Sequence, residues 1–214
     1  MTLLRATLLL SSLVLTLVLC GCLPQPRHRV FRLLGLLAIL AFGVEVTGTL
    51  TTLQHINNSV LYNIFTLVEF LLVLLMVRAH APQWSNALLA GAAVGIAAMA
   101  WNSKVNPPME FMLIEGILVI AFISTCFLLA VLWDMARTSL HPLHRVPTFW
   151  LYMGLLVYFG GLVPVVGITR YVFTADQLLA NRLWSIVPVL CILRYLLAAV
   201  ACYLEGRAAR SAHG

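Results

Sequence analysis

The sequence predicts an all-α fold: one polytopic membrane domain, residues 1–214, with seven transmembrane helices. Hydrophobic residues make up 62% of the chain and charged residues only 9%, whereas soluble domains are roughly 45–50% apolar and about 25% charged. Seven apolar segments come close to or exceed the roughly 20 residues that a helix needs to cross a bilayer. The connections between these segments are too short to form a soluble domain.

The predicted helices cover residues 3–23, 30–52, 59–78, 85–101, 110–132, 148–172 and 183–204. Turn-forming residues separate them, in "PQPRHR", "QHINNS", "RAHAPQWS", "NSKVNPPM", "SLHPLHRVP" and "TADQLLAN". The first three and the fifth are long apolar runs. The fourth, "ALLAGAAVGIAAMAW", is the shortest, and its small residues let helices approach closely, so we expect it to pack against neighbours. Pro164 in the sixth helix and Pro188 in the seventh indicate local distortion.

The distribution of Lys and Arg predicts the orientation, because basic residues favour the cytoplasmic side. With the N-terminus outside, the cytoplasmic side holds Arg27, Arg29, Arg32, Arg78, Arg137, Arg145, Arg207 and Arg210, and the outer side holds Arg5, Lys104, Arg170 and Arg182. We therefore expect a multi-pass protein of the cell's inner (plasma) membrane, with the N-terminus outside and the C-terminus in the cytoplasm. The basic residues form no single basic face, so lipid rather than nucleic acid is the expected partner, and the inner Arg-rich loops are a candidate site for a partner protein.

The N-terminal segment has an alternative interpretation. Leu19-Cys20-Gly21-Cys22 loosely resembles a bacterial lipoprotein cleavage box after an apolar run with one early Arg. Cleavage there would remove residues 1–21 and place Arg27, Arg29 and Arg32 outside the membrane, against the charge rule. We therefore expect the segment to remain as the first helix, and a mature protein beginning at Cys22 would contradict this.

Two segments suggest an internal repeat. "HRVFRLLGLLAILAFG" (28–43) opens the second predicted helix and "HRVPTFWLYMGLLVYFGG" (144–161) opens the sixth. Both contain His-Arg-Val, then Gly-Leu-Leu, then an aromatic residue followed by Gly, although their alignment needs a gap. The match favours a 3+1+3 arrangement around a linker helix; chance similarity between two Leu-rich helices is the alternative.

This layout resembles that of the SWEET and PQ-loop transporter group. Pro24-Gln25 follows the first helix, where that family has its first Pro-Gln, while "SLHPLHR" has His141-Pro142 at the place of the second. The segments "LYNIFTLVEF" (61–70) and "FWLYMGLLVYFGG" (149–161) are also similar to segments of small, uncharacterised bacterial seven-helix proteins. The first resemblance implies a solute carrier with its site at the repeat interface; the second implies no activity.

Ionisable residues inside predicted helices indicate where function resides. Glu45, Glu69, Glu115 and Arg194 lie within apolar runs, where each charge facing lipid would cost roughly 2.5–3.5 kcal/mol. They are therefore expected to face the interior of the helix bundle. Tyr62 and Thr66 share one helical stripe with Glu69, which supports an interior polar face.

These residues predict an intramembrane pocket that opens toward the outer face. Its expected ligand-binding or coupling residues are Glu45, Tyr62, Asn63, Glu69, Glu115, Tyr158 and Arg194. For Glu69 and Arg194, a structural ion pair between the third and seventh helices is the alternative to direct ligand contact. For Glu115, contact with interfacial water is the alternative. The residues Trp84, Trp101, Trp133, Trp150 and Trp184 lie near predicted helix ends and are typical of an aromatic belt.

The sequence favours a non-enzymatic function without cofactor or metal. No GxSxG, HExxH or Walker motif is present, and the His and Asp residues lie on loops or at predicted helix ends. No Lys lies in the seventh predicted helix to hold retinal. The leading hypothesis is a small-solute carrier, with proton or cation coupling as an option. The alternatives are a receptor-like sensor that acts through a partner protein, and a structural or assembly subunit. The sequence does not predict the oligomeric state.

Overall fold

The computed structural model describes residues 3–25, 27–108, 112–139, 142–173 and 176–211. Throughout these ranges the regular elements are helices, which confirms the all-α class. The α-helices are α1 (Leu3–Gly21), α2 (Arg29–Leu53), α3 (Ser59–His80), α4 (Ser85–Val105), α5 (Ile114–Thr138), α6 (Pro147–Phe173), α7 (Gln177–Trp184) and α8 (Ile186–Ser211). Short 3-10 turns at Pro82–Trp84 and Leu143–Arg145 lie in the connections. His141, from the second expected Pro-Gln position, lies outside the described residues.

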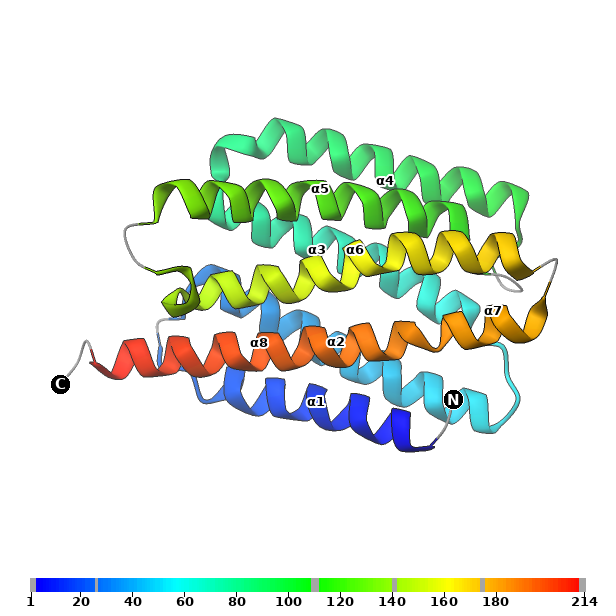
Figure 1. Cartoon of the computed structure of the whole chain (residues 1–214), viewed down its shortest axis with the longest axis horizontal. Helices are drawn as coiled ribbons and strands as arrows, with labels where there is room; N and C mark the ends of the chain where they lie inside the picture. The colour runs from blue at the N-terminus through cyan, green and yellow to red at the C-terminus, as the bar shows by residue number, and fades with distance from the viewer. Residues whose placement is uncertain (1–2, 26, 109–111, 140–141, 174–175, 212–214) are drawn as a thin grey trace.

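Six helical segments within the described ranges are long and apolar enough to cross a membrane. They contain α2, α3, α4, α5, α6 and the combined α7–α8 segment, which indicates a multi-pass membrane protein. The helices run lengthwise through the bundle, and α1 begins at the end opposite to that where α8 finishes (Figure 1). α1 is apolar but shorter than the other six, so the count of seven spanning helices stays a prediction.

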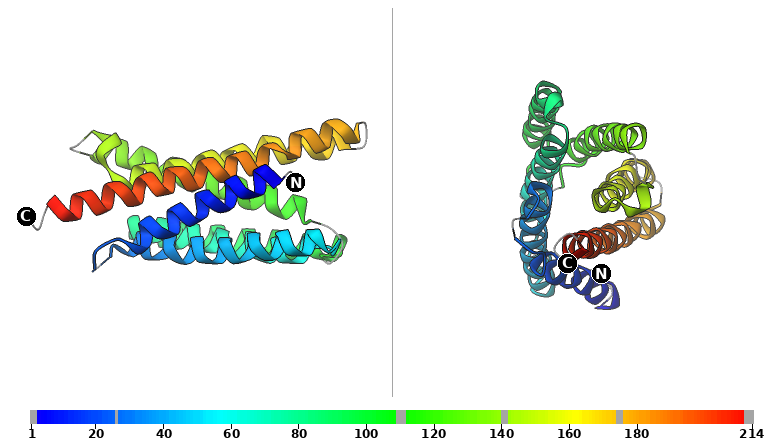
Figure 2. Two further views of the ribbon diagram at one scale, coloured as in Figure 1. Left: turned by 90° about the horizontal axis from the view of Figure 1, so that it is seen from below. Right: turned by 90° about the vertical axis from the view of Figure 1, so that its left-hand side faces the viewer.

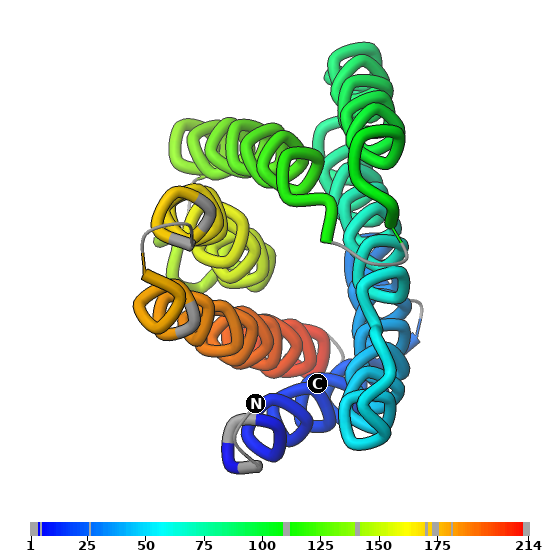
Figure 3. Tube along the Cα trace, turned by 90° about the vertical axis from the view of Figure 1, so that its right-hand side faces the viewer, coloured from blue at the N-terminus to red at the C-terminus, as the bar shows by residue number. Residues whose placement is uncertain are grey.

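The helices are arranged in two layers, with α2, α3 and α4 on one side and α1, α8, α6 and α5 on the other (Figures 2 and 3). α1 packs against both α2 and α8, α8 packs against α6, α6 against α5, and α5 against α3. Together with the α2–α3 contact, these pairs close a ring of six helices: α1, α2, α3, α5, α6 and α8. The fourth long helix of the chain, α4, lies outside this ring against α3 and α5.

The small residues of α4 allow close helix packing on one face of this helix only. A Cβ at Gly95 would lie 2.5 Å from Phe70 of α3, and one at Gly91 would lie 2.8 Å from Phe127 of α5. Nevertheless, only 17% of the residues in the apolar part of the α4 span are buried, compared with 44% for the α3 span. The expectation that α4 packs against neighbours is therefore right for its glycine face and wrong for the rest of the helix, because its peripheral position leaves most of its surface uncovered.

Two other expectations differ from the structure. Met112 and Leu113 are not helical, so α5 begins at Ile114 and its expected start at residue 110 is wrong. The last predicted helix is interrupted at Ser185, between α7 and α8. Pro188 accounts for this break, because proline has no N–H to donate to the carbonyl four residues earlier and its ring crowds that carbonyl. The proline inside α6, by contrast, is accommodated in a continuous helix.

One half of the ring is filled by apolar side chains. This half holds the connections 81–84 and 142–146, and its buried core includes Val30 of α2, Met76 of α3 and Met135 of α5. Tyr152 of α6 is fully buried there and donates a hydrogen bond from its hydroxyl to the Met76 carbonyl of α3, at 3.1 Å. The other half of the ring contains the cavity described below.

Candidate functional site

A cavity of about 270 Å³ lies inside the six-helix ring. It runs from the end that holds Asn58 and Met112 to the middle of the bundle at Glu69 and Arg194. This volume corresponds to roughly nine water molecules at ~30 Å³ each and lies just below the usual range of ligand pockets, roughly 300–1,000 Å³. Its wall comes from α1, α2, α3, α5, α6, α7 and α8, with no residue from α4. The cavity can therefore hold a small solute.

Five of the seven predicted site residues line this cavity: Glu45, Tyr62, Glu69, Tyr158 and Arg194. They come from α2, α3, α6 and α8, so residues up to 149 positions apart meet at one place. The charged members lie inside the ring, as the cost of a charge facing lipid requires.

A buried ion pair forms the floor of the cavity. Nη1 of Arg194 donates to Oε1 of Glu69, and the two residues are only 3% and 1% exposed. Nη2 of Arg194 donates to the hydroxyl of Tyr195. The guanidinium carbon also lies 4.1 Å from the ring centroid of Tyr158 and 4.3 Å from that of Tyr195, a favourable position for a cation. The positive charge is thus fixed by a carboxylate, a hydroxyl and two aromatic rings.

Close helix packing places Arg194 at this position. Gly154 of α6 faces the backbone of α8, and a Cβ there would lie 3.0 Å from the Arg194 carbonyl oxygen. Any larger residue would push α8 away from α6 and shift the guanidinium relative to Tyr158. The floor of the cavity therefore depends on the α6–α8 contact as well as on the ion pair.

Glu45 lies on the wall of the cavity and has a different environment. The Tyr62 hydroxyl donates to Glu45 Oε2 over a long distance of 3.5 Å. Gly48 makes room for this ring, because a Cβ there would lie only 3.0 Å from Tyr62 Cζ. Glu45 forms no ion pair with any described residue. It is therefore a carboxylate beside the cavity that has one weak polar partner.

The threonines near the cavity bond to the backbone, as the preference of such residues in helices predicts. Thr66 donates to the Tyr62 carbonyl at 2.8 Å, and Thr49 donates to the Glu45 carbonyl at 2.7 Å. Thr52 donates to the Gly48 carbonyl at 2.7 Å. Their hydroxyl hydrogens are thus already used within the helices.

Asn63 does not line the cavity. Its side-chain amide donates to the Pro108 carbonyl at 3.2 Å, and its oxygen accepts from the Leu113 backbone N–H at 3.0 Å. These bonds hold the α4–α5 connection against α3. Asn63 points away from the stripe of Tyr62 and Glu69 because it is the next residue along the helix, about 100° around the axis.

Glu115 also lies outside the cavity lining, so its predicted place in the pocket is wrong. It accepts a hydrogen bond of 2.6 Å from the side-chain amide of the buried residue Asn102. This contact joins the first turn of α5 to the last turns of α4, on the outer side of the ring. The prediction fails because Glu115 faces α4, where Asn102 donates to it, and not the interior of the ring.

Most of the other residues that line the cavity are not in the predicted set, and three of them show why. Trp184, assigned to the aromatic belt, lines the cavity at the end of α7, and Phe65 and Leu9 line it from α3 and α1. The sequence could have identified Phe65 as a lining residue, because it lies three residues after Tyr62 and four before Glu69 on the same helical face. The sequence could not have identified Leu9, because a uniformly apolar helix does not reveal which of its faces is internal.

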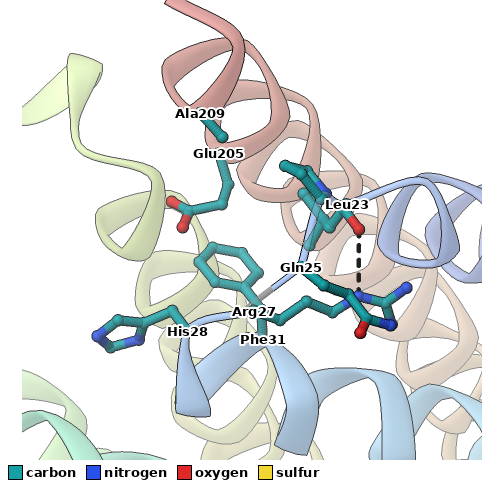
Figure 4. Close-up of a pocket in the computed structure, with 8 residues that line it drawn as sticks. Leu23, Gln25, Arg27, His28, Phe31, Glu205 and Ala209 are labelled. Atoms are coloured by element: carbon teal, nitrogen blue, oxygen red, sulfur yellow. Dashed lines mark hydrogen bonds between the residues drawn. The ribbon is translucent and has the colours of Figure 1, made fainter. Parts of the chain in front are cut away.

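A second cavity of about 80 Å³ lies at the opposite end of the bundle, between the α1–α2 connection and α8. Figure 4 shows Arg27, His28 and Glu205 around Phe31 at this place. The Arg27 guanidinium donates to the Gly21 carbonyl at 2.7 Å and to the Leu23 carbonyl at 3.3 Å. It therefore satisfies carbonyl groups at the end of α1, where a helix has no internal donors, and its role is structural.

The described cysteines are free thiols. Cys20 is buried and donates to the Phe31 carbonyl at 3.4 Å, whereas Cys22 is exposed. Among the described residues, no group of three or more His, Cys, Asp or Glu side chains could hold a metal ion. The Cys20-Gly21-Cys22 sequence thus contributes to the end of α1 rather than to a ligand cluster.

Comparisons with known proteins found no matching family model, no matching curated protein and no matching solved structure.

Proposed function

We propose that this protein is a membrane carrier that binds a small solute in the six-helix cavity. The observation that supports this most strongly is the position of the cavity, which reaches from one end of the bundle to a buried ion pair at mid-helix. Ionisable residues inside transmembrane segments typically mark solute or ion pathways. The proposal includes seven spanning helices, with the N-terminus outside and the cavity open to the outer side.

Transport requires that the packed half of the ring also opens. The Tyr152–Met76 hydrogen bond joins α6 to α3 in that half, so it is a contact that an inward-open state would break. α6 contains Pro164, and the α7–α8 segment is interrupted at Ser185. These are natural positions for a helix to bend. Protonation of Glu45 or Glu69 would change the charge of the cavity and could couple to this movement.

The test is uptake into proteoliposomes of a radiolabelled panel of amino acids, sugars, amines and carboxylic acids. The expected result is uptake of at least one solute above that of protein-free liposomes. Ala121→Phe should abolish this uptake, because Ala121 lines the cavity and the added ring would fill it. Glu69→Gln should also abolish it by disrupting the cavity floor. Glu205→Gln, at the opposite end of the bundle, is the control and should transport normally.

A receptor-like sensor is the second candidate, and the dense apolar core in one half of the ring favours it. A sensor needs a pocket open on one side only, together with a partner protein on the other. Basic residues such as Arg145 and Arg207 are exposed at that far end. Solute binding without flux, together with a co-purifying partner, would replace the carrier by the sensor. A thermal stability that no solute in the panel changes would instead favour a structural subunit.

A further inference from the structure

We propose that the cavity binds a small organic monocation whose ammonium group lies against the Glu45 carboxylate. This rests on the proposed solute-binding function and adds the chemical class of the solute. The charges that line the cavity are those of Glu45, Glu69 and Arg194, which sum to −1 when all three are ionised.

The charge of Arg194 is already neutralised by its partners. Its two terminal nitrogens donate to Glu69 and to the Tyr195 hydroxyl, and the ring centroids of Tyr158 and Tyr195 lie 4.1 and 4.3 Å from the guanidinium carbon. Nε is the guanidinium nitrogen that has no hydrogen-bond partner among the described residues, so an incoming anion would find one buried N–H there unless it displaced Glu69. Glu45, in contrast, has only the long bond from Tyr62. The uncompensated charge that a ligand meets is therefore the negative charge of Glu45.

The two helix ends at the Ser185 break add little net field. The break at Ser185 brings the C-terminus of α7 next to the N-terminus of α8. The partial negative charge of the first helix end and the partial positive charge of the second offset each other. At this wall of the cavity the side-chain charges therefore outweigh those of the helix ends.

The remaining wall suits an organic cation with an apolar body. The aromatic residues Tyr62, Phe65, Phe159 and Trp184 line the cavity beside aliphatic side chains from α5 and α6. Aromatic faces attract ammonium groups, and apolar walls stabilise a hydrocarbon body by excluding water. A cavity of about 150 Å³ is sufficient for benzene, so about 270 Å³ accommodates one ring with an aminomethyl group.

Three probes of nearly equal shape test this proposal: benzylammonium, benzyl alcohol and benzoate. Their binding to the purified full-length protein is measured by calorimetric titration and by the shift of the unfolding temperature. We expect benzylammonium to bind at least tenfold more tightly than the other two. Glu45→Gln should weaken benzylammonium binding at least tenfold without changing that of benzyl alcohol. Glu205→Gln is the matched carboxylate control and should leave all three affinities unchanged.

The outcomes separate this inference from the proposed function. Equal binding of the three probes, or a preference for benzoate, overturns the monocation while leaving a solute site in place. A preference for benzylammonium that persists in Glu45→Gln overturns the assignment to Glu45. If no probe binds but proteoliposomes take up another class of solute, the monocation proposal alone is overturned. If no probe binds and no solute is taken up, both the monocation proposal and the carrier proposal are overturned. If Glu45→Gln does not fold, Glu45→Asp replaces it in the test. The shorter side chain keeps the negative charge but moves it away from the ligand, so an unchanged benzylammonium affinity in Glu45→Asp overturns the assignment to Glu45.

Discussion

Removal of one partner from the buried ion pair should destabilise the protein strongly. Glu69 and Arg194 are 1% and 3% exposed, so neither charge gains from bulk water when its partner is lost. Breaking a fully buried pair typically costs about 3–5 kcal/mol. Glu69→Gln keeps the volume and one acceptor oxygen, so we expect about 3 kcal/mol, a substantial part of a typical total stability of about 5–15 kcal/mol.

A double variant separates the ion pair from simple packing. Glu69→Leu combined with Arg194→Met replaces both charges with apolar side chains of similar volume, and such replacements are often neutral or stabilising. We expect the double variant to unfold within about 1 kcal/mol of the native protein. The single variants Glu69→Leu and Arg194→Met complete the cycle. With about 3 kcal/mol lost in each single variant and about 1 kcal/mol in the double variant, the coupling energy is about 5 kcal/mol.

The assay is equilibrium unfolding in mixed dodecyl maltoside and dodecyl sulfate micelles, followed by circular dichroism. Glu205→Gln serves as the control, because Glu205 forms no ion pair with a described residue. A loss below about 1 kcal/mol in Glu69→Gln, with additive effects in the double variant, would refute the reasoning. It would mean that Arg194 finds equivalent partners without Glu69, as side chains can in the membrane-unfolded state.

Three other changes test the packing and the hydrogen bonds. Gly95→Ala should destabilise the same unfolding transition by about 1–3 kcal/mol, because its Cβ would lie 2.5 Å from Phe70, whereas Gly43→Ala should be neutral or stabilising, since nothing lies within 4 Å of that position. Tyr152→Phe should lower the free energy of unfolding by about 0.5–1.5 kcal/mol through loss of one buried hydrogen bond; no change would show that the bond contributes nothing. Asn63→Ala removes both bonds to the α4–α5 connection, so limited proteolysis should cut that connection faster, and an unchanged rate would contradict its holding role.

The sequence predicted the class and most helix positions because lipid imposes a simple requirement on length and polarity. α2 and α3 begin within one residue of the expected positions, and α6 does as well. The error at α5 arose because Met112 and Leu113 are apolar without being helical. Pro188 predicted a distortion of the last helix, and the structure places it at Ser185 as a complete break.

The candidate site was predicted to the extent that helical spacing and charge determine it. The requirement that charges avoid lipid identified Glu45, Glu69 and Arg194 correctly as facing the interior. It could not distinguish the ring interior from the contact between α4 and α5, and so Glu115 was placed wrongly. The ring itself was not predictable, since the small residues of α4 indicated close packing without showing that the helix lies outside the ring.

The closed ring has a consequence for biogenesis. Glu69 and Arg194 are 125 residues apart in the chain, and ribosomes add about 5–20 residues per second. The carboxylate of α3 therefore enters the translocation machinery roughly 6–25 seconds before the guanidinium of α8 is made. During that interval the nascent protein carries an acidic group without its counter-ion. Insertion must either proceed with that group protonated or shelter it inside the machinery until the last helix arrives.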